Sequence, residues 1–162
     1  MMQLGCTLPV IAWLKANEPQ TLGRARHVLC AKDYVRYRLT GRIATDESEA
    51  AMAPVSAVTR DFHPDQAKLL GIEEHVHLLA TVERGESRAG DVTTEAASLT
   101  GLVAGTPVAI GTGNTGACVL GAGAYKPGQP VTVLGTTCLN GVLSDRAAYQ
   151  PRDLGLLRDV AV

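Results

Sequence analysis

Apolar positions near the start of the chain recur at helical spacing. Between Pro9 and Arg26, a polar background is interrupted by Val10, Ile11, Trp13, Leu14 and Leu22. This pattern predicts an amphipathic helix. Because proline has no backbone N–H to donate inside a helix, the helix should be interrupted at Pro19. At this spacing Trp13 is expected in the core rather than on a ligand-binding surface.

A short apolar run and a second periodic segment follow. Residues 27–31 read His-Val-Leu-Cys-Ala, which is typical of a buried strand. Residues 32–41 place apolar side chains near helical spacing and close with Gly41, a typical residue after a helix end. We therefore predict a strand followed by a helix, with Asp33 capping the helix and Tyr34 packed in the interior.

The middle of the chain is less strongly patterned. Small residues dominate residues 44–60, which we interpret as mostly loop. Residues 64–71 predict a short helix, because proline stands in the first turn and glycine at the end. Residues 73–90 are expected to be irregular or extended. Residues 93–101 predict another short helix, with Thr93 as a suitable N-cap and an acidic first turn.

The most informative pattern begins at Pro107. Residues 108–110 form a brief apolar strand pattern that runs into Gly-Thr-Gly-Asn-Thr-Gly at 111–116. Residues 117–124 are small, apolar and compatible with a helix. This segment therefore predicts a strand, a glycine-rich turn and the start of a helix.

Two further apolar runs predict a β-hairpin. Residues 131–134 and 139–143 flank Gly135, Thr136 and Thr137 like two strands around a tight connection. The change to glycine-rich sequence at 125–128 marks a candidate domain boundary.

Composition limits the classes of protein that the chain can represent. Its 162 residues are enough for one compact domain or for part of something larger. Hydrophobic residues make up 46% and charged residues 19%, so the chain can bury a core and is not of the disordered class. Aromatic residues are scarce, which favours a mixed helix-and-sheet core of aliphatic side chains.

Charge and cysteine spacing argue against several kinds of partner. The formal net charge is -1 without long runs of either sign, so a nucleic-acid partner is not expected. Cys6, Cys30, Cys118 and Cys138 fit neither a zinc spacing nor a small disulfide scaffold. No apolar run reaches the length of a membrane span, and a secretory signal is not evident, so a cytoplasmic location is the expectation.

Two turns have the composition of phosphate-binding loops. Glycine lets backbone N–H donors approach a phosphate closely, and threonine supplies hydroxyl groups, as in residues 111–116 and 135–137. Neither turn is a Walker A loop, because no Gly-Lys-Ser/Thr follows. Residues 111–116 fit the bare Gly-x-Gly-x-x-Gly pattern, but the acidic residue expected about twenty positions later is absent, which argues against a nicotinamide site.

Several blocks of the sequence, in order, resemble the FGGY family of carbohydrate kinases. Residues 7–19 resemble the family signature Pro-x-x-Lys-Leu-x-Trp-Leu-x-x-Asn-x-Pro, although Val10 stands where lysine is frequent. Residues 25–41 resemble the next block, and Thr-Asp-Glu-Ser at 45–48 resembles the Thr-Asp-x-Ser segment after it. Residues 93–107 resemble the stretch before the catalytic turn, and residues 134–137 the turn that contacts the ATP phosphates.

This resemblance implies an α/β fold of the actin-like ATPase (ribonuclease-H-like) class. In that fold two lobes enclose sugar and MgATP in the cleft between them. The resemblance places residues 1–125 in the C-terminal part of the first lobe and residues 126–162 at the start of the second. The chain would thus be an internal fragment that holds the end of one lobe and the first hairpin of the next.

The resemblance also implies chemistry for particular residues. The family transfers phosphate from ATP, with Mg²⁺, to a hydroxyl group of a sugar or polyol; a xylulose-like ketose or an erythritol-like polyol is the expected substrate. Gly113 and Thr115 are expected to contact the sugar. The residues expected at the ATP phosphates are Gly135, Thr136 and Thr137. A homo-oligomer is compatible with the sequence, and neither a nucleic acid nor a membrane is an expected partner.

Two departures from the family pattern bear on activity. A complete kinase of the family is several times longer, and its first phosphate turn and its adenine site are not found in this chain. The family's catalytic turn generally reads Gly-x-x-Asp, whereas aligning Gly111 places Asn114 at the position of the catalytic Asp. An amide cannot accept the proton of the attacking hydroxyl group. The chain alone is therefore expected to be inactive and to bind MgATP weakly.

Other interpretations remain open at the level of the sequence. One is a noncatalytic sugar-binding or regulatory member of the family, and another is a structural fragment without a ligand. His75 and His77 are expected to be surface residues rather than metal ligands, because no third ligand lies nearby. The Lys32-Asp33-Tyr34 segment could form part of a site, although a structural role is the simpler interpretation.

Overall fold

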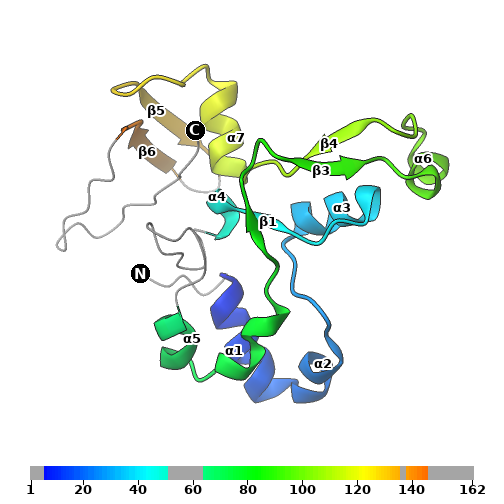
Figure 1. Cartoon of the computed structure of the whole chain (residues 1–162). Coiled ribbons are helices and arrows are strands. Elements are labelled where there is room, and N and C mark those ends of the chain that lie inside the picture. The colour runs from blue at the N-terminus through cyan, green and yellow to red at the C-terminus, as the bar shows by residue number, and fades with distance from the viewer. Residues whose placement is uncertain (1–5, 51–63, 136–137, 146–162) are drawn as a thin grey trace.

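The computed structural model describes residues 6–50, 64–135 and 138–145 (Figure 1). In chain order, the helices are α1 (Thr7–Asn17), α2 (Pro19–Arg24), α3 (Ala31–Thr40), α4 (Glu47–Ala50), α5 (Pro64–Leu69), the 3₁₀ helix η1 (Glu73–Leu78), α6 (Thr94–Thr100) and α7 (Asn114–Gly121). The strands are β1 (Thr45–Asp46), β2 (Val82–Glu83), β3 (Arg88–Asp91), β4 (Pro107–Ala109), β5 (Pro130–Leu134) and β6 (Cys138–Val142).

Helices α1, α2, α5 and η1 pack around one hydrophobic core in the lower part of Figure 1. The buried side chains of this core are Leu8, Ile11, Leu22, Ala67, Ile72 and Leu78. The predicted interruption is confirmed, because α1 ends at Asn17 and α2 begins with Pro19 in its first turn. The prediction for Trp13 is wrong: its side chain is 55% exposed, because α1 turns Leu8 and Ile11 toward the core instead.

Helix α3 follows a segment that is less regular than predicted. The helix is confirmed, and Gly41 ends it in the left-handed conformation (φ 77°). The strand predicted over residues 27–31 is reduced to a single parallel bridge between Val28 and Leu79. Because Val28 also packs against the helical core, this short run crosses from one packed unit to the next instead of extending a sheet.

The segment after α3 contains more structure than the predicted loop. Strand β1 pairs in parallel with β2, with Thr45 opposite Val82, and α4 follows β1 directly. The rest of the predicted loop, residues 51–60, lies outside the described residues. The segment predicted as irregular or extended begins with the 3₁₀ helix η1, so that part of the prediction is wrong, whereas β2 and β3 are extended as expected.

Strands β3 and β4 form an antiparallel pair, and α3 packs against both β3 and α6. A bulge between Arg88 and Gly90 shifts the register of β3. The prediction of α6 is confirmed: the Thr93 hydroxyl oxygen accepts a hydrogen bond from Ala96 N at 3.1 Å, and Gly101 ends the helix with φ 77°. Ala44, Ala89 and Ile110 form a second buried cluster between these elements.

The last described elements are the predicted helix and hairpin. Helix α7 begins at Asn114, and β5 pairs with β6 in an antiparallel register that sets Leu134 opposite Cys138. Both elements lie in the upper left of Figure 1, where α7 contacts β5. Pro127 and Gly128 form the predicted turn before the hairpin, with Gly128 at φ 85°.

Candidate functional site

The glycine-rich turn lies where β4 ends and α7 begins. Gly111 adopts φ 86°, and its N–H donates to Gly85 O at 2.8 Å, so the turn is tied to the loop before β3. Gly113 is the buried N-cap residue of α7. The side chain of Asn114, the first residue of α7, is exposed, and Thr115 Oγ1 lies 3.5 Å from Asn114 Oδ1. The structure thus presents Asn114 to solvent from a fixed backbone.

The turn packs directly on α4. Gly113 N donates a 2.6 Å hydrogen bond to Ser48 Oγ, and Thr112 Oγ1 lies 2.8 Å from the same oxygen. A Cβ atom on Gly113 would lie 3.2 Å from Ser48 Oγ and 3.4 Å from a carboxylate oxygen of Glu49. A larger residue at position 113 would therefore need the side chain of Ser48 or Glu49 to shift by a few tenths of an ångström. The backbone of Gly113 itself (φ -61°, ψ 162°) is ordinary extended structure.

Beneath the turn, the carboxylate of Asp46 organises the start of α4. Its Oδ1 accepts hydrogen bonds from Ser48 N at 2.9 Å and from Glu49 N at 3.2 Å. The Ser48 hydroxyl group donates to the same oxygen. Asp46 is only 1% exposed, and it forms an ion pair with Lys32 through Oδ2. A buried carboxylate with these partners remains ionised.

The ion pairs continue from Lys32 into α3. Lys32 Nζ lies 2.6 Å from Asp33 Oδ1, and Arg36 Nη1 donates to the same oxygen at 2.8 Å. Arg36 also donates to Ile110 O at 2.7 Å and to Ala44 O. Arg36 therefore connects α3 to the end of β4 and to the residue before β1.

The structure corrects two predictions about α3. Asp33 does not cap the helix, because the N-cap residue is Cys30 and no side chain makes a capping hydrogen bond. Its carboxylate is instead buried between Lys32 and Arg36. Tyr34 does not pack in the interior; its ring is 51% exposed and its hydroxyl oxygen accepts a hydrogen bond from Arg38. Charge pairing, not hydrophobicity, decides which side of α3 faces inward.

The network shifts the acid–base behaviour of its members in opposite directions. Burial alone would raise the pKa of Asp46, but hydrogen bonds from Lys32 and Ser48 outweigh it and hold the pKa of Asp46 below its usual value. Burial alone would lower the pKa of Lys32, yet its hydrogen bonds to Asp33 and Asp46 raise that pKa. Both groups are therefore charged at neutral pH.

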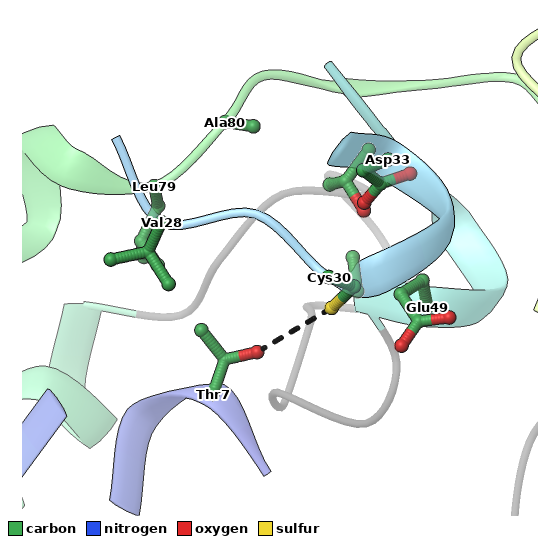
Figure 2. A pocket seen from close by; sticks show the side chains of 9 residues that line it. Thr7, Val28, Cys30, Asp33, Glu49, Leu79 and Ala80 are labelled. Atoms are coloured by element: carbon green, nitrogen blue, oxygen red, sulfur yellow. Dashed lines mark hydrogen bonds between the residues drawn. The ribbon is translucent and has the colours of Figure 1, made fainter. Parts of the chain in front are cut away.

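Asp33 also lines a small cavity. Figure 2 shows Thr7, Cys30, Asp33 and Glu49 around it, with Thr7 Oγ1 4.0 Å from the Cys30 sulfur. Its volume of about 20 Å³ has room for one water molecule. Burial raises the pKa of the Cys30 thiol to about 12, and Glu49 adds to the rise. The cavity is thus too small for a sugar, and its thiol is not a nucleophile at neutral pH.

The residues predicted at the ATP phosphates are only partly placed. Gly135 follows β5 and is exposed, whereas Thr136 and Thr137 lie outside the described residues. Residues 6–50, 64–135 and 138–145 contain no group of three or more His, Cys, Asp or Glu side chains that could hold a metal ion. No described residue is therefore assigned to Mg²⁺. His75 and His77 lie on η1, where His77 Nδ1 is 2.7 Å from Glu74 O. In the part of the chain that the structure describes, no helix is long and apolar enough to cross a membrane.

The sequence did not reveal the roles of Arg36, Asp46 and Ser48. The Asp-x-Ser spacing was a usable signal, because an Asp side chain that accepts N–H groups two and three residues later is a common way to start a helix. Nothing local marks Arg36, since a lysine or arginine three residues after an aspartate is usual on a solvated helix face.

Comparison with known proteins places this geometry in context. The sequence model described as the N-terminal domain of the FGGY family of carbohydrate kinases matches residues 1–121. Autoinducer-2 kinase from Yersinia enterocolitica is 32% identical over 130 residues, which cover 80% of this chain and 24% of that protein. Xylulose kinase from Bacillus subtilis is 30% identical over 150 residues, which cover 92% of this chain and 29% of that protein.

A solved structure gives the same result at the level of the fold. The crystal structure of xylulose kinase from Rhodospirillum rubrum aligns with a TM-score of 0.82 at 27% identity, covering 93% of this chain and 30% of that one. The expected fold, part of the actin-like, ribonuclease-H-like ATPase fold with mixed helices and strands, is thereby confirmed. The chain spans about a quarter to three tenths of the length of these relatives.

Proposed function

Because this chain belongs to the FGGY family of carbohydrate kinases, we propose that the protein that carries it transfers phosphate from ATP to a hydroxyl group of a sugar or polyol. Membership of the family implies the use of ATP and Mg²⁺. The similar proteins named above carry kinase names, which supports a phosphotransferase. The chain would supply one wall of the site, since it corresponds to less than a third of the length of each relative.

The observation that carries this proposal is the position of Asn114. It is exposed at the first position of α7, directly after a turn held from below by Ser48 and from the side by Gly85. In the family pattern this position carries the carboxylate that accepts a proton from the attacking hydroxyl group. The amide of Asn114 can orient that hydroxyl group but cannot take its proton. General base catalysis contributes ~10²–10⁴ in rate, so turnover should be slow.

For the substrate, we favour a xylulose-like ketose, with an erythritol-like polyol as the next candidate. The names of the similar xylulose kinases from B. subtilis and R. rubrum support the ketose. Gly113 and Thr115 flank Asn114 and would lie beside the acceptor hydroxyl group. Gly135, Thr136 and Thr137, which stand between β5 and β6 in the sequence, would contact the ATP phosphates.

We also propose that the lobe boundary falls near Tyr125. Residues 1–125 would complete the first lobe, and residues 126–162 would begin the second. The end of the family match at residue 121 and the turn at Pro127 and Gly128 support this division.

Phosphoryl transfer by the full gene product, measured against a panel of ketoses and polyols with MgATP, tests the proposal. We expect a slow, acceptor-dependent release of ADP with at least one ketose or polyol, and sugar binding in calorimetry. Binding without transfer, even after Asn114→Asp, would identify a noncatalytic sugar-binding protein instead. If the protein neither binds nor phosphorylates any acceptor of the panel, a sugar site is contradicted altogether.

A further inference from the structure

The hydroxyl group of Ser48 joins two parts of the chain that are far apart in sequence. It contacts Asp46 at the start of α4, and it contacts Thr112 and Gly113 in the turn before α7. Ser48 is buried, with 8% of its surface exposed. A buried hydroxyl group with three protein partners is fixed in one orientation.

Counting donors and acceptors gives the direction of each hydrogen bond. The ionised carboxylate of Asp46 only accepts, so the single hydroxyl hydrogen of Ser48 points to Asp46 Oδ1. The Ser48 oxygen then has two lone pairs, one of which accepts from Gly113 N. The other accepts from the hydroxyl group of Thr112, which must therefore be the donor of that pair. Ser48 uses its complete hydrogen-bonding capacity, and two of the three bonds hold the turn.

Asp46 is itself fixed, so Ser48 is held from below. The backbone N–H groups of Ser48 and Glu49 donate to Asp46 Oδ1, and Lys32 pairs with Oδ2. This connects α3, through Lys32, to the backbone that immediately precedes Asn114.

We propose that Ser48 is a positioning residue for the reaction, which sets the place of Asn114 by holding Gly113. This inference rests on the proposed function for its catalytic consequence. Ser48 acts through Gly113, because its hydroxyl oxygen accepts a hydrogen bond from Gly113 N–H. The carbonyl carbon of Gly113 is in turn bonded to the backbone nitrogen of Asn114. Because a misplacement of about 1 Å in a reacting group can cost about 10²-fold in rate, a loosened turn should slow transfer while sugar binding persists.

Amide hydrogen exchange of Gly113 in the Ser48→Ala variant tests the contact without any substrate. We expect exchange at Gly113 to become faster by about tenfold or more, the effect of losing ~1.4 kcal/mol of local protection. Exchange at Ala97, in α6, should stay unchanged. Ser98→Ala is the matched control, because Ser98 is exposed and its hydroxyl group donates to Glu95 O, away from the turn. Unchanged exchange at Gly113 in a folded Ser48→Ala protein would overturn the proposal.

Kinetics in an Asn114→Asp background test the catalytic consequence. There, Ser48→Ala should lower kcat by about 10–100-fold with little change in KM for the sugar, and Ser48→Thr, which keeps the hydroxyl group, should recover part of the loss. An unchanged kcat would overturn the positioning role. If Asn114→Asp transfers no phosphate to any acceptor, the proposed function fails, whereas the exchange experiment still decides whether Ser48 holds the turn.

If Ser48→Ala does not fold, a less disruptive variant tests whether Ser48 holds the turn. Thr112→Val removes the donor to Ser48 and keeps the shape of the side chain. Gly113 exchange a few-fold faster than in the unaltered protein would support the proposal. Exchange at the unaltered rate would contradict it.

Discussion

Four charged side chains, Lys32, Asp33, Arg36 and Asp46, meet beneath the turn that carries Asn114. Arg36 and the two aspartates are almost fully buried, at 4% exposure or less. Taking such groups out of water is unfavourable unless each is paired and hydrogen-bonded. Arg36 Nη1 and Nη2 donate to one carboxylate and two carbonyl groups, which a lysine could not satisfy in the same planar geometry, and Arg36 Nε has no hydrogen-bond partner among the described residues.

The Arg36→Met variant should be severely destabilised. Among the residues that the structure describes, it leaves Asp33 with Lys32 as its remaining cationic partner, and it removes the Arg36 donor from the carbonyl groups of Ala44 and Ile110. Breaking a buried ion pair by removing one partner commonly costs ~3–5 kcal/mol in the free energy of unfolding. Urea denaturation measures this loss. Arg38→Met, on the exposed side of the same helix, is the control and should change stability by less than about 0.5 kcal/mol. Equal losses of unfolding free energy in both variants would show that the buried ion pairs of Arg36 stabilise the fold no more than the exposed side chain of Arg38 does.

Stability should also fall in acid, with Asp46 as one cause. The pKa of Asp46 is lower in the folded protein than its unfolded value of about 3.9, so the unfolded state binds more protons between the two values. The stabilisation from Asp46 is therefore complete above about pH 5 and is lost as the pH falls through its folded pKa. Unfolding free energies measured from pH 6 to pH 2 should show a shallower decline in Asp46→Asn. If the unfolding free energy declined equally steeply with falling pH in both proteins, Asp46 would not be a cause of the acid sensitivity.

At the scale of elements, contacts between turns rather than long strands fix the backbone that precedes Asn114. Strands β1 and β2 are two residues long, and β4 has three. The position of the Asn114 turn depends instead on two close contacts, one of Gly113 with Ser48 and one of Gly111 with Gly85. In the latter, a Cβ atom on Gly85 would lie 2.6 Å from Gly111 O.

Gly85→Ala should therefore displace the turn. A contact of 2.6 Å with a backbone oxygen cannot be relieved by rotating a side chain, and overpacking of this kind typically costs ~1–3 kcal/mol. Gly23→Ala is the matched control, because no described atom beyond its chain neighbours and the backbone of its own helix lies within 4 Å of the added Cβ. Gly23 lies in helix α2, where alanine is favoured over glycine by up to about 1 kcal/mol. Thermal unfolding should show opposite signs for the two variants. A neutral Gly85→Ala would contradict the close approach.

Elements with local signals could be predicted from the sequence, and elements that depend on distant contacts could not. Thr93 and Gly101 bound α6 as predicted, because a cap and a left-handed glycine act within one turn of chain. The hairpin and the start of α7 follow equally local patterns. Helix η1 was missed because its residues, Glu-Glu-His-Val-His-Leu, have no periodicity of 3.6, and only Leu78 is buried.

The candidate site likewise has one part with a local sequence signal and one part that depends on distant contacts. Asn114 and its turn could be proposed from the sequence, because the glycine spacing lies within one short segment and the blocks that resemble the family align that segment with the catalytic turn. The support beneath them joins Lys32 to Asp46 and Ser48 to Gly113, across 14 and 65 positions, and no local pattern specifies such pairs. Asp33 was mistaken for a helix cap because a carboxylate near a helix start usually acts on its own helix.

At the scale of the whole molecule, the blocks that resemble the family in sequence meet around one backbone turn. The blocks at 25–41 and 45–48 and the aligned turn at 111–114 are separate in the chain, yet Lys32, Asp46, Ser48 and Gly113 form one chain of direct contacts. The backbone of Gly113, which Ser48 holds, directly precedes Asn114 at the start of α7.

The most direct test is the rate of ATP-dependent phosphorylation by the full gene product, compared between the unaltered protein and Asn114→Asp. At saturating MgATP and ketose, restoring a carboxylate should raise the rate by ~10²–10⁴-fold, because a proton acceptor is then placed at the attacking hydroxyl group. Asn17→Asp, an exposed change at the end of α1, is the control and should leave the rate unaltered. A rate that is the same with asparagine and aspartate at position 114 would contradict the account.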